Sequence, residues 1–173
     1  GVAVYVRDTF SSKVVFEDFE DITRETHEQI LIEVTVDRFR FLVGILYRPP
    51  SSKKNNTSVP NFIESIDVFL SCITVRYDKI LILGDVNIDH FNVRNPIFQS
   101  FAAYDFVQLI NDPTRITQTS QKLIDVIYCN FPDMVLNSGT INADLIADHQ
   151  LVYCTLNIKF NKIQPKFITY RDF

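Results

Sequence analysis

Hydrophobic and polar residues alternate in two segments of the first third of the chain. The alternation runs through residues 29–36 ("QILIEVTV") and, less regularly, through residues 39–47 ("FRFLVGILY"). A period of two predicts β-strands, and the two residues between these segments predict a hairpin. The same pattern in residues 1–6 ("GVAVYV") predicts a strand at the start of the chain. Because the chain starts inside this pattern, we expect it to begin within a domain.

A different period follows the polar, proline-containing loop at 48–58. Apolar residues recur at helical spacing from 59 to 73, with Ser58 as a candidate cap and Pro60 in the first turn. Residues 95–104 ("NPIFQSFAAY") predict a second helix that begins at Asn95.

The remaining apolar segments are short. Residues 79–84 ("KILILG") form a continuous apolar run, as in a strand that is buried on both faces. Further strands are expected near 107–110, 123–129, 139–141 and 151–160. This order of strands and helices predicts a mixed α/β fold with a sheet core and helices outside it.

Length and composition are those of one domain with a sizeable core. The chain has 173 residues, of which 46% are hydrophobic, and a net charge of −4. This charge argues against binding nucleic acid through bulk positive charge, but a divalent metal could still neutralise a phosphodiester substrate. We expect a domain at 1–160 and a linker at 161–173.

Cysteine usage indicates an intracellular protein. Three cysteines lie far apart without a CxxC pair, which fits reduced thiols better than a disulfide framework or a zinc site. No apolar run approaches the length of a membrane span, so we expect no membrane partner.

The first candidate site is "LGDVNIDH". Gly84 lets the backbone turn after the buried strand, and Asp85 and Asn87 then project from the same side of an extended chain. Ligands bind at this end of strands in α/β sheets. Asp85 could act as a general base there, with Asn87 positioning a water. The alternative is an Asx-turn in which both residues only cap the following loop.

An aspartate–histidine pair is the second candidate. Asp148 and His149 precede a strong strand, where a histidine could transfer a proton or stabilise a phosphate oxygen. The alternative is an ordinary surface loop. The same dipeptide occurs at Asp89-His90, which we interpret as loop because no buried strand follows it.

Asp125 is the third candidate, because it lies inside an apolar run where an unpaired carboxylate is costly. A histidine is the obvious partner, although a solvent-facing strand end is an equal alternative.

Tyr47 and Arg48 form the fourth candidate, because a hydroxyl and a guanidinium at a strand end could both reach a phosphate. Ordinary surface residues would give the same pattern.

Four motifs follow one another along the chain in this order: "YRPP", "GDVNID", "PTRIT…LIDVIY" and "ADHQLV". Together they resemble the exonuclease–endonuclease–phosphatase superfamily, and within it the endonuclease domains of non-LTR (LINE, jockey-like) retrotransposons. The ends "GVAVYVR" and "ITYRDF" are similar to that group as well. The resemblance implies a two-sheet α/β sandwich flanked by helices, here N-terminally truncated.

The resemblance also implies a function and a set of roles. The protein would nick DNA with Mg²⁺ (or Mn²⁺), in the nucleus and with a fused reverse transcriptase in the full-length element. Asp85 would activate the attacking water and Asn87 would position it. His149 would stabilise charge on the phosphoryl oxygens, with Asp125 orienting its ring.

Further roles concern the metal and the substrate. Asp148 would assist at the metal, and Tyr47 would contact the scissile phosphate. Arg48, Arg115 and Thr117 would bind substrate, with Thr114 nearly as good a match as Thr117. The polar stretch from Gln118 to Lys122 would be a hairpin that probes a DNA groove.

Two departures from the family pattern lower the expected activity. The strands that carry an Asn and the metal-binding Glu would precede Gly1, and Glu28 and Glu33 lie on a different strand. Ala147 stands where the family usually has Ser. We therefore expect this chain to be nearly inactive as it stands. Two alternatives remain: another phosphodiesterase or phosphatase of the same fold, and a non-catalytic remnant or binding module.

Overall fold

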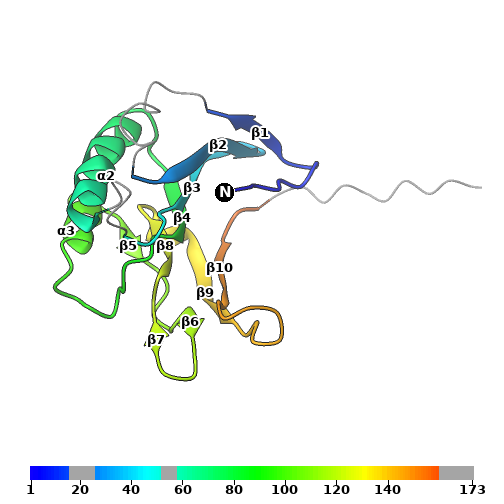
Figure 1. The fold of residues 1–173 in the computed structure, drawn as a ribbon. Coiled ribbons are helices and arrows are strands. Elements are labelled where there is room, and N and C mark those ends of the chain that lie inside the picture. The colour runs from blue at the N-terminus through cyan, green and yellow to red at the C-terminus, as the bar shows by residue number, and fades with distance from the viewer. Residues whose placement is uncertain (16–25, 52–57, 160–173) are drawn as a thin grey trace, which may run out of the picture.

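Six strands form the main sheet in a computed structural model that describes residues 1–15, 26–51 and 58–159 (Figure 1). The strand order is β1-β2-β3-β4-β8-β5. The pair β3–β4 is parallel and the other pairs are antiparallel. The strands are β1 (Ser11–Val14), β2 (Glu28–Val36), β3 (Phe39–Tyr47), β4 (Ile80–Asp85), β5 (Val107–Gln108) and β8 (Asp125–Cys129).

The β2–β3 hairpin confirms the prediction from the alternating pattern. The register runs from Val36 opposite Phe39 to Glu28 opposite Tyr47. Asp37, in the turn, has a positive φ of 53°, a conformation that aspartate tolerates better than most residues. The turn therefore fixes the register of both strands.

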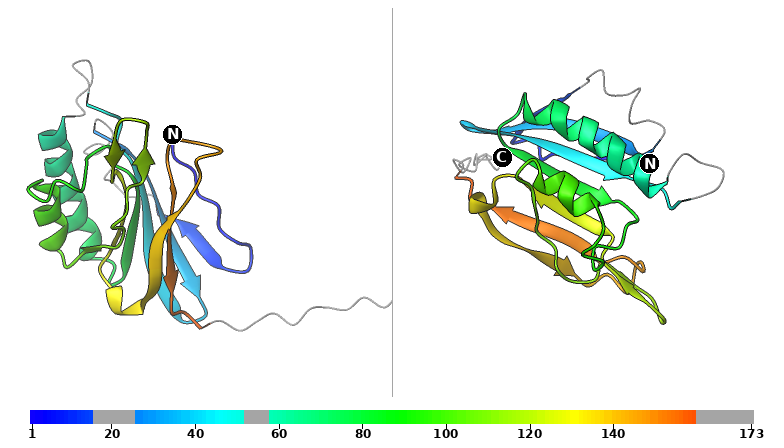
Figure 2. Two further views of the ribbon diagram at one scale, coloured as in Figure 1. Left: turned by 90° about the horizontal axis from the view of Figure 1, so that it is seen from below. Right: turned by 90° about the vertical axis from the view of Figure 1, so that its left-hand side faces the viewer.

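Two helices cover one face of the main sheet (Figure 2). They are α2 (Val59–Thr74) and α3 (Ile97–Ala102). Ser58 caps α2 as predicted, because its hydroxyl accepts a hydrogen bond from the Asn61 amide at 3.3 Å. The second helix is shorter than predicted. Asn95 still accepts from the Ile97 amide, so it closes a turn before the helix begins.

A small second sheet lies on the other face. It consists of β9 (Val135–Ile141) and β10 (Leu151–Leu156), which pair antiparallel. Successive residues of β4 point alternately to the two faces: Ile80 and Ile82 pack in the cluster beneath the helices, and Leu81 and Leu83 in the cluster facing the second sheet. The protein is therefore a two-sheet α/β sandwich flanked by helices, as expected.

A hairpin and a short helix complete the described elements. Strands β6 (Arg115–Ile116) and β7 (Gln121–Lys122) pair antiparallel, which places the predicted DNA-probing stretch in a hairpin (Figure 1). The 3₁₀ helix η1 (Pro132–Met134) leads into β9. No helix of the described residues is long and apolar enough to cross a membrane.

The predicted strand at residues 1–6 is wrong. The structure assigns no strand there, and the first strand begins at Ser11. Val4 and Val6 nevertheless pack against the cluster that faces the second sheet. An extended segment that contacts the core on one side shows the same alternation as a strand. The alternating pattern therefore could not distinguish the two. The expected linker at 161–173 lies outside the described residues and stays a prediction.

Candidate functional site

Three strand ends of the main sheet meet in one row. Tyr47 lies opposite Asp85 in the β3–β4 pair, and Asp85 lies opposite Asp125 in the β4–β8 pair. Residues paired across neighbouring strands point to the same face of a sheet. Leu83, two residues before Asp85, packs toward the second sheet, so this row projects to that side.

Gly84 allows β4 to approach β3 closely just before Asp85. Its φ is +149°, and a Cβ at this position would overlap the backbone carbonyl of Leu46 on β3. Glycine is therefore required for the close approach of the two strands just before Asp85.

The turn after Asp85 is an Asx-turn. The Oδ1 atom of Asp85 accepts from the Asn87 amide at 2.9 Å, and Oδ2 accepts from Asn87 Nδ2 at 3.1 Å. Asn87 has a φ of 48° and also donates through Nδ2 to the Arg48 carbonyl at 3.0 Å. The Asx-turn and a functional site are thus compatible, because the turn fixes the Asp85 side chain within the row and that of Asn87 next to it.

The environment of Asp85 favours its neutral form relative to an exposed aspartate. Burial raises the pKa of this carboxyl above its ordinary value, and the nearby Asp125 raises it further. Hydrogen bonds from Asn87 and the charge of His149 oppose this shift of the pKa. A carboxylate with a raised pKa is the better proton acceptor, which suits a general base.

Asp125 and His149 form a carboxylate–imidazole pair. Nδ1 of His149 lies 2.9 Å from Oδ2 of Asp125, although 24 residues separate them in the sequence. An ionised carboxylate can only accept, so Nδ1 carries the proton and Nε2 is left for another partner. Thr114 is completely buried and accepts from the Asp125 amide at 2.9 Å, which holds the start of β8.

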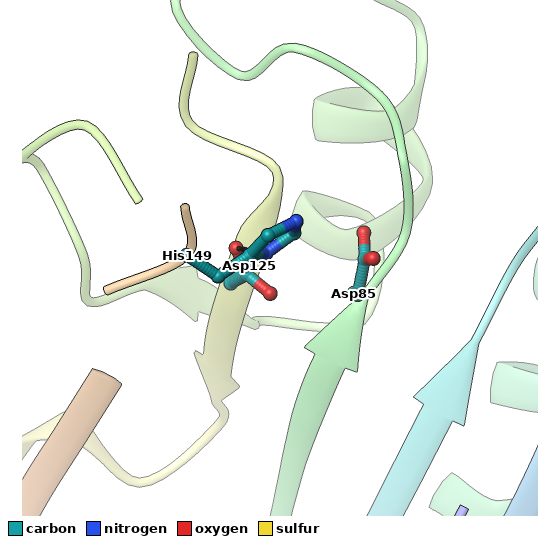
Figure 3. A group of neighbouring side chains, drawn as sticks. All are labelled: Asp85, Asp125 and His149. Carbon is teal, nitrogen blue, oxygen red and sulfur yellow. Dashed lines mark hydrogen bonds and ion pairs between the residues drawn. The ribbon is translucent and has the colours of Figure 1, made fainter. Parts of the chain in front are cut away.

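The pair and Asp85 come together at one place (Figure 3). One ligand atom from each of Asp85, Asp125 and His149 lies within 4.8 Å of the other two. Two carboxylates and an imidazole this close can hold a divalent cation, and Mg²⁺ is commonly bound by one or two carboxylates together with substrate phosphates. The donor set therefore fits a catalytic divalent metal.

Asp148 is placed differently from the prediction. It does not belong to the group formed by Asp85, Asp125 and His149. Its Oδ2 accepts instead from Arg115 Nε at 3.0 Å, and this hydrogen bond lowers the pKa of Asp148. Asp148 and Arg115 thus form an ion pair with each other. The sequence predicted a metal role for Asp148 and a substrate role for Arg115.

Arg48 requires a correction. It was predicted to bind substrate, but its side chain is fully buried. Nη1 donates to the carbonyls of Val86 and Asn87 at 3.1 and 3.3 Å, Nη2 donates to Ser51, and the guanidinium lies over the Phe62 ring. Burial lowers the pKa of Arg48, and Asp85 opposes this. Arg48 therefore supports the turn from behind, and a strand-end position alone could not reveal that.

Of the two threonines considered for phosphate contact, Thr117 is the accessible one. It is exposed in the β6–β7 hairpin, where its hydroxyl lies 3.0 Å from that of Ser120. Thr114 is buried and occupied by the backbone of β8. Tyr47 is half-buried within the row.

His90 is a residue that sequence reasoning missed. The Asp89-His90 pair does lie in a loop, as predicted, but the imidazole is 4% exposed and hydrogen-bonded on both sides. The available signal was alternation, because His90 follows Val86 and Ile88 at a spacing of two and all three are buried.

The fold is similar to that of several solved structures. The endonuclease domain of TRAS1, a telomere-specific non-LTR retrotransposon, matches with a TM-score of 0.67 at 12% identity, over 88% of this chain and 71% of that one. D. rerio TDP2 complexed with single strand DNA product matches with 0.55 at 15%, over 86% and 67%. An endonuclease/exonuclease/phosphatase family protein from Leptotrichia buccalis matches with 0.53 at 12%, over 75% and 54%. No family model and no curated protein matches the sequence.

The chain has the endonuclease/exonuclease/phosphatase fold. It spans little more than half of the Leptotrichia chain and about seven tenths of the TRAS1 domain. In this fold the row of Tyr47, Asp85 and Asp125 and the neighbouring His149 lie at the ends of strands, where α/β sheets bind ligands. Fold alone does not decide the reaction, so the function rests on these side chains.

Proposed function

We propose that this protein hydrolyses phosphodiester bonds in DNA with a divalent metal, as an endonuclease domain of the non-LTR retrotransposon kind. The observation that carries the proposal is the convergence of Asp85, Asp125 and His149, from three distant parts of the sequence, within 4.8 Å. The resemblance to TRAS1, described as a retrotransposon endonuclease domain, supports the DNA-nicking form of this chemistry.

Asp85 acts as the general base in this proposal. Its carboxylate removes a proton from the attacking water, and the raised pKa brings it closer to the value at which a base works best near neutral pH. Asn87 holds the Asp85 carboxylate through two hydrogen bonds, so the base has a fixed direction. Fixed geometry of this kind supplies a large part of the rate gain in such reactions.

His149 stabilises the charge that grows on the phosphoryl oxygens. With Nδ1–H donated to Asp125, the protonated ring presents Nε2–H as a donor to an oxygen. Asp125 fixes the ring orientation through this hydrogen bond. Tyr47, in the same row, is available to contact the phosphate from the β3 side.

Mg²⁺ or Mn²⁺ would be held by the carboxylates of Asp85 and Asp125 together with oxygens of the substrate. When bound, the cation supplies positive charge to the phosphate and lowers the pKa of a coordinated water. Asp148 would join this set only by leaving its ion pair with Arg115. With two carboxylates and no glutamate in the group, we expect weak metal affinity and slow cutting.

DNA is the proposed partner because of the hairpin beside the site. Strands β6 and β7 carry Arg115 and Lys122, and the turn between them carries Thr117. Arg115 forms a backbone bridge with His149. The related D. rerio TDP2 structure holds a single strand DNA product, which also supports this choice. A fused reverse transcriptase and a nuclear location follow from the same proposal.

Supercoiled plasmid tests the proposal directly. The chain should convert it to open circles with Mg²⁺ or Mn²⁺, and chelation by EDTA should stop the conversion. Small phosphoesters such as bis(p-nitrophenyl) phosphate, assayed in parallel, should be poorer substrates. Preference for the small esters would favour another phosphodiesterase or phosphatase of the same fold, and no hydrolysis of either would favour a non-catalytic module.

A further inference from the structure

The second aspartate–histidine pair is tied into the core through its imidazole. Nδ1 of His90 lies 2.7 Å from the Ile88 carbonyl, and Nε2 lies 2.9 Å from the Tyr128 hydroxyl. A carbonyl can only accept, so Nδ1 carries the proton and Nε2 accepts from Tyr128. His90 therefore occupies one defined neutral tautomer with both nitrogens engaged.

Tyr128 is a rigid anchor for this bond. Its ring is buried and stacks on Phe101 of α3 at 3.7 Å between centroids, with an interplanar angle of 6°. It lies on β8 three residues after Asp125 and, by the alternation of the strand, on the opposite face of the sheet. The His90–Tyr128 bond thus connects the turn to β8 from behind the candidate site.

Backbone hydrogen bonds dock the same loop on the segment that leads into β8. The His90 amide donates to the Leu123 carbonyl at 2.8 Å, and the Val86 amide donates to the Ile124 carbonyl at 3.0 Å. Asp89 Oδ1 accepts from the Leu123 amide at 3.3 Å. The loop that begins at Asp85 therefore runs along residues 123–124, which directly precede Asp125.

We propose that His90 is a positioning residue, which through Tyr128 holds the turn of Asp85 and Asn87 at a fixed separation from Asp125. This inference rests on the proposed nuclease function. Asn87 has a left-handed backbone conformation, which asparagine adopts more readily than most residues but still at a cost, so contacts around the turn help to hold it. Loss of the anchor lets the turn relax, and small displacements of a catalytic group reduce rates strongly.

Two amide substitutions separate the two hydrogen bonds of His90. His90→Gln places an oxygen where Nε2 lies, so it can still accept from Tyr128. His90→Asn places its amide where Nδ1 lies, so it can serve only Ile88. Tyr128→Phe removes the hydroxyl and keeps the stacked ring. Ile73→Val is the matched control, because Ile73 is a buried α2 residue at the end of the sheet away from Asp85.

Single-turnover nicking of plasmid by the full chain, at a temperature where every variant is folded, is the measurement. We expect His90→Asn and Tyr128→Phe to lose about tenfold in rate, and His90→Gln to stay within about twofold of the parent. In the Tyr128→Phe background the two His90 variants should be equally slow. Ile73→Val should lose stability but keep the parent rate.

Failure of the positioning role and failure of the proposed function would give different results. A parent chain that nicks, with His90→Asn just as fast, would overturn the positioning role and leave the proposed function standing. Equal losses in His90→Asn and His90→Gln, unaffected by Tyr128→Phe, would also overturn it, because the tyrosine bond would then carry no positioning. A parent chain that neither nicks nor binds Mn²⁺ would overturn the proposed function, and the positioning role with it.

Discussion

His149 Nδ1 donates to Asp125 Oδ2 over 2.9 Å, joining the loop before β10 to the first residue of β8. In the proposed function the two residues have separate tasks, because His149 presents Nε2 to the site and Asp125 fixes the ring. Removing either residue should therefore impair the same step.

Asp125→Asn should reduce the nicking rate by about 10²- to 10⁴-fold, and His149→Ala by a similar factor. The asparagine amide can donate to Nδ1 and so favours the wrong tautomer of His149. The double variant should be little worse than either single variant, because the pair acts as one unit. Additive losses in plasmid-nicking rates would mean that the two residues act independently.

Asp85→Asn should abolish measurable nicking while modestly raising the free energy of unfolding near neutral pH, because solvent screens this partly exposed carboxyl. A carboxyl whose pKa is raised by folding opposes folding once it is ionised. The destabilisation by ionised Asp85 is complete above the pKa that this carboxyl has in the folded protein. It disappears as the pH falls below the ordinary aspartate pKa of 3.8. The stability gain should therefore shrink with falling pH in urea titrations. A gain that grows toward low pH would contradict the direction of the pKa shift.

Gly84→Ala should lower the free energy of unfolding by about 3 kcal/mol or more, because the new Cβ would overlap the Leu46 carbonyl. Gly139→Ala, in β9, is the matched control. Its Cβ would meet only Tyr153 at an ordinary contact distance of 3.5 Å. We expect the control to change stability by less than about 1 kcal/mol. Similar urea midpoints for the two variants would argue against the close approach of β3 and β4.

Arg48→Met should cost about 2–3 kcal/mol of stability, because the buried carbonyls of Val86 and Asn87 lose their donor. Nicking should fall as well, since those carbonyls belong to the turn that carries Asp85. If Arg48 were an exposed phosphate-binding residue, its substitution would cost little stability. DNA binding by the variant would then depend less steeply on salt concentration than binding by the parent. Thermal unfolding together with DNA binding at several salt concentrations distinguishes the two roles.

The sequence predicted the parts of this fold that depend on strong local patterns. Strands β2 and β3, their hairpin and the capped start of α2 follow from alternation, turn residues and a serine before a proline. The convergence of Asp85, Asp125 and His149 depends on β4 pairing with β8, which no local pattern encodes, and was reached through the family resemblance.

Other features could not be predicted for physical reasons. Whether Arg48 and His90 face solvent or the core depends on how loops fold back over the sheet, and both proved buried. The segment at 1–6 alternates because one side touches the core, without strand pairing. Such cases are where tertiary contacts override sequence patterns.

Binding of Mn²⁺ followed by NMR of the imidazole protons tests the central claim most directly. The chain has three histidines, so His27 and His90, both buried on the helix-covered side of the main sheet, serve as internal references for His149. We predict that Mn²⁺ below one equivalent broadens the His149 signals first, and that Asp85→Asn weakens this effect. A His149 signal that stays sharp, or broadening spread evenly over all three histidines, would contradict a metal site held by Asp85 and Asp125 beside His149.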